Sequence, residues 1–238
     1  MLLPIDELAV TMERELCYQR WAGLTGLAGA LLFFCGDMFV TGHWGAGATF
    51  HEGVLRMLRE SSQNRLFIGG LLGPVAGCLC ILGFWHVRQN LVGRSPMLGR
   101  IVFFALAAAM VAVSVVHSLL VPLALARRYS DAHGGTAQEL IEALRNYTGL
   151  AYSLAKGPAY LGAILLLVLV VLGKSSYPRW TALTNFGLLL LLDPLVIRVP
   201  APLGAALVGG FESLCLTVFF LVSVISTWRR PTVQLPPG

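Results

Sequence analysis

Long apolar stretches follow one another along the chain with only short polar stretches between them. A helix needs about 20 apolar residues to cross the hydrocarbon core of a bilayer. Six segments meet this requirement: Trp21–Gly42, Leu66–Val87, Ile101–Ala126, Leu150–Gly173, Thr181–Val199 and Ala205–Thr227. The pattern therefore predicts an all-α integral membrane protein, a polytopic bundle of about six transmembrane helices. The fifth segment is the shortest, and Pro194 and Pro200 predict that its far end is irregular.

The two ends of the chain differ from these apolar segments. Residues 1–20 contain several acidic side chains instead of the basic start and apolar centre of a signal peptide. We therefore expect an interfacial helix there, followed by a transmembrane domain over residues 21–228. The tail, residues 229–238, is rich in proline, and we expect it to be disordered and cytoplasmic.

Composition supports a membrane protein with no separate soluble domain. Hydrophobic residues make up 56% of the chain and charged residues only 12%, whereas soluble domains contain about 25% charged residues. The net charge of +5 would raise the question of nucleic acid in a soluble protein. Here the basic residues mostly flank the apolar segments, so we expect membrane lipids as partners and no nucleic acid. The five cysteines lie in or next to apolar segments, which indicates packing or lipid contact.

The distribution of basic residues predicts the orientation, because short cytoplasmic loops are enriched in Lys and Arg. If the N-terminus is inside, nine basic residues lie on the cytoplasmic side and seven on the other. The two inner loops between helices contain Arg88, Arg94, Arg100, Lys174 and Arg179 and no acidic residue. We therefore predict a multi-pass protein of the cell membrane with both termini in the cytoplasm.

Ionisable side chains inside the spans are the most informative residues, because they are costly in a bilayer and usually face a partner or a polar cavity. They are Asp37, His117, Lys156, Asp193 and Glu212. Successive spans run in opposite directions, so all five positions fall in the same, outer half of the membrane. Their shared depth predicts a polar pocket that opens outward. The simpler alternative is that each charge reaches the headgroups or forms a structural pair.

Further residues are candidates for the same pocket. A glycine-rich first loop contains Trp44, His51 and Glu52 and could fold over the bundle. Aromatic residues of the spans could line the deeper part, among them Phe33, Tyr152, Tyr160, Phe186, Phe211 and Phe219. Small residues in the first two segments, Gly23, Gly26, Gly29, Gly69, Gly73 and Gly77, predict close contact between those helices.

A group of several carboxyls and one or two cations can keep some acids neutral and others ionised, which acid and base catalysis requires. Our first hypothesis is an enzyme that protonates an alkene or epoxide of a lipophilic substrate and then removes a proton. The catalytic candidates are Asp37, Glu212, Glu52 and Asp193. The candidates for substrate binding are His117, Lys156, Tyr160, Trp44, His51 and Phe211. Asp37 and Glu212 are the preferred pair, because Asp193 could instead pair with the nearby Arg198.

The chain also resembles the small bacterial membrane-bound terpene cyclases in its size, number of spans and acidic residues placed in separate spans. That family generally depends on two acidic residues, so the resemblance implies a cyclase or isomerase that acts on an isoprenoid substrate. The segments Gly36–Phe39, Tyr177–Trp180 and Pro200–Gly204 are also similar to those of uncharacterised bacterial six-span proteins.

Three other functions are compatible with the pattern. The chain could be a transporter or channel whose polar outer vestibule binds an ion or small solute. It could hold a metal or haem through His43, His51 and His117, although the His51-Glu52 pair lacks the second histidine of a helical zinc motif. A structural or assembly role is the third. Our prediction is an enzyme that needs no cofactor and no metal.

Overall fold

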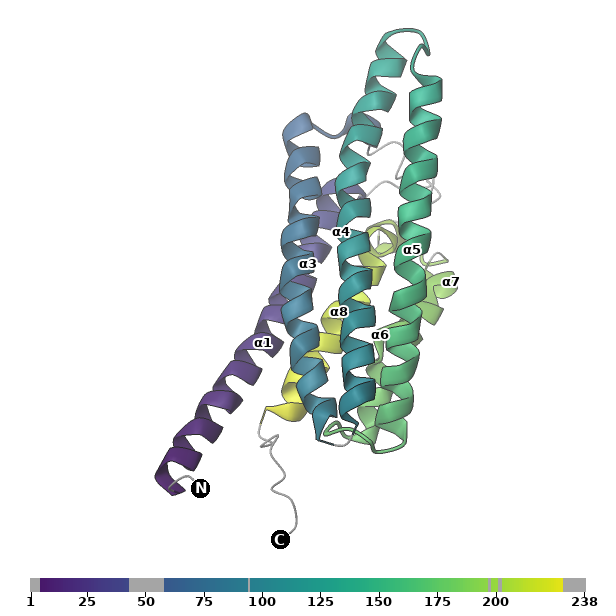
Figure 1. The fold of residues 1–238 in the computed structure, drawn as a ribbon. Coiled ribbons are helices and arrows are strands. Elements are labelled where there is room, and N and C mark those ends of the chain that lie inside the picture. Colours follow the sequence, from purple (N-terminus) through teal and green to yellow (C-terminus); the bar gives the residue numbers. More distant parts are fainter. Residues whose placement is uncertain (1–4, 43–57, 94, 197, 201–202, 229–238) are drawn as a thin grey trace.

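The computed structural model describes residues 5–42, 58–93, 95–196, 198–200 and 203–228, and every regular element in them is helical. Five of the helices are long and apolar enough to cross a membrane. They are α1 (Ile5–Val40), α3 (Gln63–Val92), α4 (Pro96–Ala132), α5 (Gln138–Val171) and α8 (Leu203–Thr227) (Figure 1). The described part of the chain is therefore an all-α bundle, as its hydrophobic pattern predicts.

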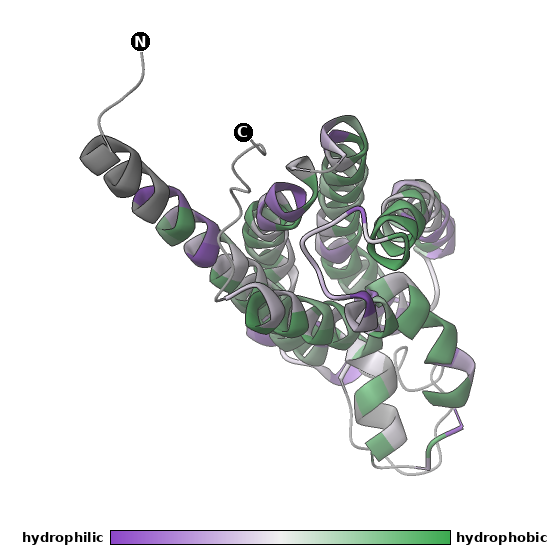
Figure 2. Cartoon of the chain, turned by 90° about the horizontal axis from the view of Figure 1, so that it is seen from below, coloured by the Kyte–Doolittle hydropathy of each residue, from purple (hydrophilic) through white to green (hydrophobic). Residues whose placement is uncertain are grey.

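Lipid, not water, is the solvent that suits the surface of this bundle. Large apolar side chains such as Leu71, Phe104 and Ile164 are 70%, 67% and 57% exposed. The view along the bundle shows hydrophobic residues over much of the helix surface (Figure 2). Hydrocarbon can surround such a surface, because the backbone N–H and C=O groups of a long helix bond to one another within the helix and need no water.

The fifth predicted segment is not one continuous helix. It is divided into η1 (Arg179–Thr184), α6 (Phe186–Leu189), η2 (Leu190–Leu192) and α7 (Asp193–Val196). The irregularity thus extends along the whole segment, and the count of six long helices is not confirmed within the described residues. The chain still returns here from the end of the bundle where α5 finishes to the end where α8 begins (Figure 1).

Asn185 explains the first interruption. Its side-chain oxygen accepts hydrogen bonds from the backbone N–H groups of Gly187 and Leu188, at 3.0 and 3.3 Å. An asparagine that bonds its neighbours in this way starts a helix instead of continuing one. Its amide nitrogen donates to the carbonyl of Ala163 in α5 at 3.1 Å. The interruption is therefore fastened to the neighbouring helix.

The described part of the predicted interfacial segment is continuous with the first span. Helix α1 runs without a break from Ile5 to Val40, and its N-terminal half extends away from the bundle in Figure 1. A lateral position of residues 5–20 at the membrane surface stays a prediction.

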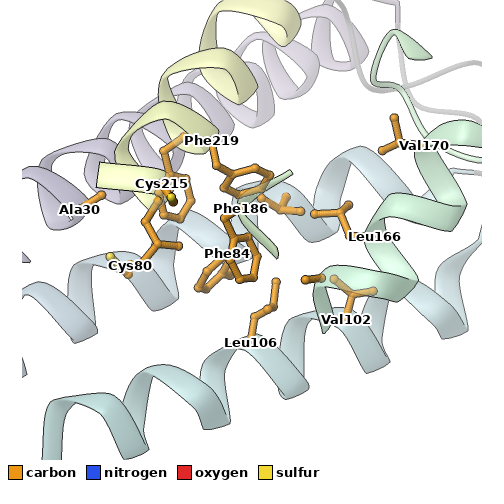
Figure 3. Packing of buried hydrophobic residues seen from close by; sticks show 14 of the residues in the cluster. Ala30, Cys80, Phe84, Val102, Leu106, Leu166, Val170, Phe186, Cys215 and Phe219 are labelled. Atoms are coloured by element: carbon orange, nitrogen blue, oxygen red, sulfur yellow. The ribbon is translucent and has the colours of Figure 1, made fainter. Parts of the chain in front are cut away.

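Glycines hold α1 against α3, as their spacing predicts. Gly26 and Gly83 face each other so closely that a Cβ on either would collide with the Cα of the other. Beside this contact lies an aromatic core in which Phe84 contacts Phe186, Phe219 and Phe220, with ring centroids 5.1 to 6.5 Å apart (Figure 3). The core fixes α3, α6 and α8 relative to one another.

Candidate active site

Two adjoining cavities lie between α1, α4, α5, the interrupted segment and α8. The first, which we call the Asp37 cavity, has a volume of about 160 Å³. The second, the Asp193 cavity, has a volume of about 180 Å³. They share the lining residues Val113, Tyr152, Ala159, Phe186, Leu190 and Glu212. Most of the other residues around the Asp37 cavity are apolar, namely Phe33, Met110, Val116, Leu120 and Leu216.

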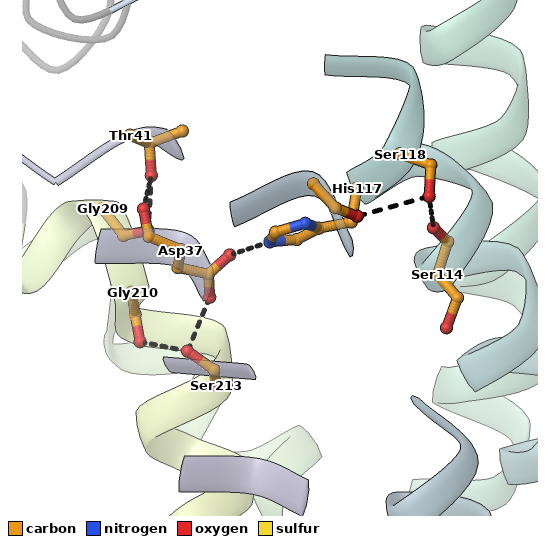
Figure 4. A network of polar contacts seen from close by, with 9 residues as sticks. Asp37, Thr41, Ser114, His117, Ser118, Gly209, Gly210 and Ser213 are labelled. Atoms are coloured by element: carbon orange, nitrogen blue, oxygen red, sulfur yellow. Dashed lines mark hydrogen bonds and ion pairs between the residues drawn. The ribbon is translucent and has the colours of Figure 1, made fainter. Parts of the chain in front are cut away.

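Asp37 is hydrogen-bonded through both of its carboxyl oxygens (Figure 4). Oδ1 lies 3.2 Å from Nε2 of His117 in α4, and Oδ2 lies 2.6 Å from the hydroxyl of Ser213 in α8. The single hydroxyl proton of Ser213 also has the carbonyl of Gly210 within reach, at 2.9 Å, but the carboxyl oxygen is closer. The carboxyl group therefore joins three helices that are distant in the sequence.

Glycines make room for the His117 ring. The imidazole side chain is only 4% exposed, and it packs against Gly36 of α1 and Gly73 of α3. Phe33 meets it edge to face, with ring centroids 5.2 Å apart and an interplanar angle of 88°. Within the described part of the chain Nδ1 has no hydrogen-bond partner. Hydrogen bonding to Asp37 is therefore what orients the ring.

The end of α1 that carries Asp37 is held by a side chain of α3. Arg65 donates hydrogen bonds of 2.8 to 2.9 Å to the carbonyl oxygens of Met38, Phe39 and Gly42. These carbonyls lack partners within the helix, and a cation at a helix C-terminus is also favourable electrostatically. Arg65 thus fixes the last turn of α1, which contains Asp37.

A kink in α8 brings the other polar residues to the same place. Gly210 has non-helical backbone angles (φ −131°, ψ 21°) and lies against Phe34 and Met38 of α1. The hydroxyl of Thr41, the residue that follows α1, donates to the carbonyl of Gly209 at 2.9 Å. The helix resumes past the kink with Glu212 and Ser213 on the side that faces the cavities.

Glu212 and Tyr152 form the second polar group of the site. The Tyr152 hydroxyl of α5 donates a hydrogen bond to Oε1 of Glu212. Lys156 follows one turn later on the same face of α5, and its Nζ lies 4.4 Å from the centre of the Tyr152 ring. Tyr152 therefore contacts the carboxyl through its hydroxyl and the ammonium group through its ring.

The structure brings together most of the residues that the sequence singles out. Asp37, His117 and Glu212 line the Asp37 cavity, and Lys156, Tyr160, Asp193 and Glu212 line the Asp193 cavity. Asp193 and Arg198 form no salt bridge, because the pairs within 4.0 Å in the described residues are Arg59–Asp131 and His117–Asp37. The expected structural pairing of Asp193 is therefore not observed.

Other candidates lie elsewhere. Phe211 is 8% exposed and belongs to the hydrophobic core, so our expectation that it contacts a substrate in the pocket is not met. The reason is its angle on α8, since each residue turns a helix by about 100° and Glu212 and Ser213 take the cavity side. Trp44, His51 and Glu52 lie outside the described residues.

Two parts of the site go beyond the sequence prediction. Ser213 was not a candidate, although a hydroxyl next to Glu212 in an apolar segment is a usable signal. Tyr152 was expected only as an aromatic wall, whereas its hydroxyl binds the Glu212 carboxyl. Among the described residues, no three His, Cys, Asp or Glu side chains are grouped so that they could hold a metal ion.

Comparison with curated proteins and with solved structures gave no match. Comparison with protein families gave one match, which covers all of the predicted transmembrane domain together with the last turn of the segment before it and the first residue of the tail. Residues 17–229 match a family of unknown function (DUF6796), and the chain belongs to that family.

Proposed function

We propose that this protein is an integral membrane enzyme that adds a proton to a lipophilic substrate and removes another, in the manner of an isomerase or cyclase. One observation carries the proposal: two hydrogen-bonded carboxyl groups from different helices, Asp37 and Glu212, line a single, otherwise largely apolar cavity. Separate carboxyls in different surroundings are the arrangement that acid and base catalysis uses.

The hydrogen bonds favour particular roles for the two carboxyls. Both oxygens of Asp37 face potential donors, His117 Nε2–H and the Ser213 hydroxyl, and such donors stabilise a carboxylate. Asp37 with His117 is therefore the proton acceptor. Tyr152 engages only Oε1 of Glu212, which leaves Oε2 to carry a transferable proton. Glu212 is therefore the proton donor.

The proposed reaction is balanced without a further reactant. The O–H bond of Glu212 breaks, and the alkene electron pair forms a C–H bond at one carbon, which leaves a carbocation at its neighbour. Asp37–His117 takes a proton from an adjacent carbon, and the electrons of that C–H bond form the new double bond. In a cyclisation, a second alkene of the same substrate attacks the cation before this proton is lost. Transfer of the proton from Asp37–His117 back to Glu212 restores the starting state.

The size and lining of the cavities support an isoprenoid-containing substrate. A cavity of about 150 Å³ is large enough for benzene, so the Asp37 cavity suits one five-carbon unit at the reacting position. The adjoining Asp193 cavity, with Tyr160 and Leu190 in its wall, would hold the next part of the chain. Substrates of this class dissolve in the bilayer and reach the site from the lipid.

For the membrane topology we propose six crossings, of which the fifth is interrupted. The short apolar helices over Phe186–Val196 support this, as does the return of the chain from the end of α5 to the start of α8. Together with the excess of basic residues in the short inner loops, this supports our proposal that both termini lie in the cytoplasm. The two cavities then lie in the outer half of the cell membrane.

The alternative is a transporter with a polar outer vestibule. It would need a pathway through the opposite half of the bundle, where the described cavities have volumes of only about 10 Å³. A solute that accumulates in proteoliposomes without chemical change would favour this alternative over the enzyme.

The test compares lipids extracted from cells that express the native chain, Asp37→Asn, Glu212→Gln or Glu142→Gln and that are supplied with polyprenyl or epoxidised precursors. Glu142 is an exposed residue of α5 outside both cavities and serves as the matched control. We expect the native chain and Glu142→Gln to give a product of unchanged mass but different chromatographic retention. If no lipid differs between native and cavity variants at equal amounts of folded protein, the proposed enzyme activity is wrong.

A further inference from the structure

We infer that the Asp37 cavity is a binding site for lipophilic cations, with an alkylated ammonium group as the chemical class of ligand. The inference rests on the proposed function in one respect, because it takes the same cavity as the substrate site. It goes further by naming the charge of the group that the cavity holds, and this can be measured without turnover.

The charges around the cavity favour a cation. Among the residues that the structure describes, Asp37 and Glu212 are the two acidic residues in its lining, and neither Lys nor Arg lines it. The one group there that could become positive is His117, and its Nε2 already faces Asp37. Lys156 belongs to the lining of the Asp193 cavity alone. A cation that enters the Asp37 cavity therefore meets carboxyl groups and no fixed positive charge.

Aromatic rings add a second attraction. Phe33, Tyr152 and Phe186 belong to the lining of the cavity, and a ring face attracts a cation within about 6 Å, most strongly where water is excluded. The contact between Lys156 and Tyr152, at 4.4 Å, already shows this type of interaction at the wall between the two cavities. Rings and carboxyls together offset the cost of moving a cation out of water.

The shape of the site determines the rest of the ligand. A volume of about 160 Å³ suits a small substituted ammonium group. Ala159 and Leu190 line both cavities, so an alkyl chain on the ammonium group would extend past them into the Asp193 cavity. The ammonium group would occupy the position of the carbocation that proton transfer from Glu212 creates. A stable cation of this form would therefore bind more tightly than a neutral molecule of the same size.

The experiment uses the full-length protein in lipid nanodiscs at pH 7. N,N-dimethyldodecylamine, which is protonated at this pH, is compared with N,N-dimethyldodecanamide, which has the same chain length and is uncharged. The midpoint of thermal unfolding is recorded against ligand concentration, because a ligand that binds the folded state raises it. We expect the amine to raise the midpoint at concentrations where the amide has little effect.

Variants then locate the site. The amine concentration for half of the maximal shift should rise about tenfold or more in Asp37→Asn and in Glu212→Gln, because a bound ammonium group favours the carboxylate form that Glu212 has after proton transfer. It should stay at the native value in Glu142→Gln. Phe33→Leu keeps an apolar lining without the ring, so it should weaken binding of the amine and leave any effect of the amide unchanged. It also keeps the inference testable if the Asp37 variant does not fold.

Two results would overturn the inference: equal shifts with amine and amide, or a full amine shift in the folded carboxyl variants. Failure of the proposed function would look different. If the amine binds as expected but no lipid is converted, the cation site is supported and the proposed enzyme activity is refuted. If lipids are converted but the amine does not bind, only the inference of a cation site is refuted.

Discussion

Two polar clusters lie in opposite halves of this bundle, and each contains a buried histidine. In one, His117 bonds to a carboxyl group at the edge of a cavity of about 160 Å³. In the other, His86 of α3 is 2% exposed, and Nδ1 lies 2.9 Å from the backbone oxygen of Gln19 in α1. The spaces beside this second cluster have volumes of about 10 Å³, enough for one water molecule at most.

The His86 cluster joins chain segments and leaves no room for a ligand. Asn90 donates to the backbone oxygen of His86 at 3.0 Å, and the Thr227 hydroxyl lies 3.4 Å from His86 Nε2. Nearby, Tyr177 shares a hydrogen bond of 2.7 Å with Ser223 of α8. Burial raises the pKa of Tyr177 above its ordinary value, so this hydroxyl keeps its proton.

A buried histidine in a membrane helix is therefore not by itself a sign of function. Both histidines are almost fully enclosed and both are hydrogen-bonded. Only His117 has a carboxyl partner and an adjoining volume that a substrate could enter. The proposed chemistry would therefore take place in the half with the cavities, whereas the His86 cluster would contribute stability. The following mutations distinguish these two roles.

The largest expected effect is on catalysis in the half with the cavities. Glu212→Gln should lower the initial rate of product formation by at least about 100-fold, because a positioned acid contributes roughly 10² to 10⁴. The measurement is product formed per amount of folded protein in nanodiscs. The matched change Glu142→Gln should retain the native rate, and an equal loss in both variants would contradict the role of Glu212.

In the other half, His86→Ala should lower the free energy of unfolding by roughly 2 to 3 kcal/mol, through lost hydrogen bonds and a new cavity. Chemical unfolding of the detergent-solubilised protein measures this difference. Activity per folded molecule should stay native. A His86 variant that is stable but inactive would show that both halves take part in catalysis.

The two tyrosines provide a matched pair, since each loses only a hydroxyl on mutation to phenylalanine. Tyr177→Phe should cost about 1 kcal/mol of stability, the usual value of one hydrogen bond, without a change in rate. Tyr152→Phe should lower the rate about tenfold, because Glu212 loses its hydrogen-bond donor. Unfolding and rate are measured in parallel on both variants. A large loss of rate in Tyr177→Phe, with a native rate in Tyr152→Phe, would refute the two roles.

The smallest expected effect concerns Lys156. Its ammonium group lies over the Tyr152 ring but outside the Asp37 cavity, so Lys156→Met should change the rate by no more than about threefold, as for a charge that acts through one weak contact. Affinity for N,N-dimethyldodecylamine should increase slightly, because a nearby positive charge is removed. A large loss of rate would mean that Lys156 itself contacts the reacting group.

The level of a residue along the bundle could be predicted from the sequence, and the rotation of the helices could not. Asp37, His117 and Glu212 come together because alternating spans put them in the same half of the bundle. Hydropathy says nothing about the angle of a side chain around its helix, so it could not show that Ser213 faces the Asp37 cavity and that Phe211 packs in the hydrophobic core. The kink at Gly210 lies in a Gly-Gly pair and against Phe34 and Met38 of α1, so the angle of the residues after it also depends on a contact that hydropathy does not register.

The interruption of the fifth segment had a signal that hydropathy does not register. Pro194 pointed to an irregular end, but the first break occurs at Asn185, where a single amide replaces helical hydrogen bonds. The average over a long apolar window hides one polar residue. The ability of one side chain to bond to the backbone is therefore as informative about whether a helix is continuous as the hydrophobicity of the segment is.

The fastening of Asn185 to α5 has a consequence for substrates of different length. One end of the shared cavity wall is anchored there, next to Phe186, whereas residues 191–195 beyond it are exposed. One end of this wall is therefore fixed to α5, and the residues beyond it face outward from the bundle. We expect the far end of a substrate too long for the two cavities to extend past these exposed residues, while α5 and the aromatic core keep the reacting end in register with Asp37 and Glu212.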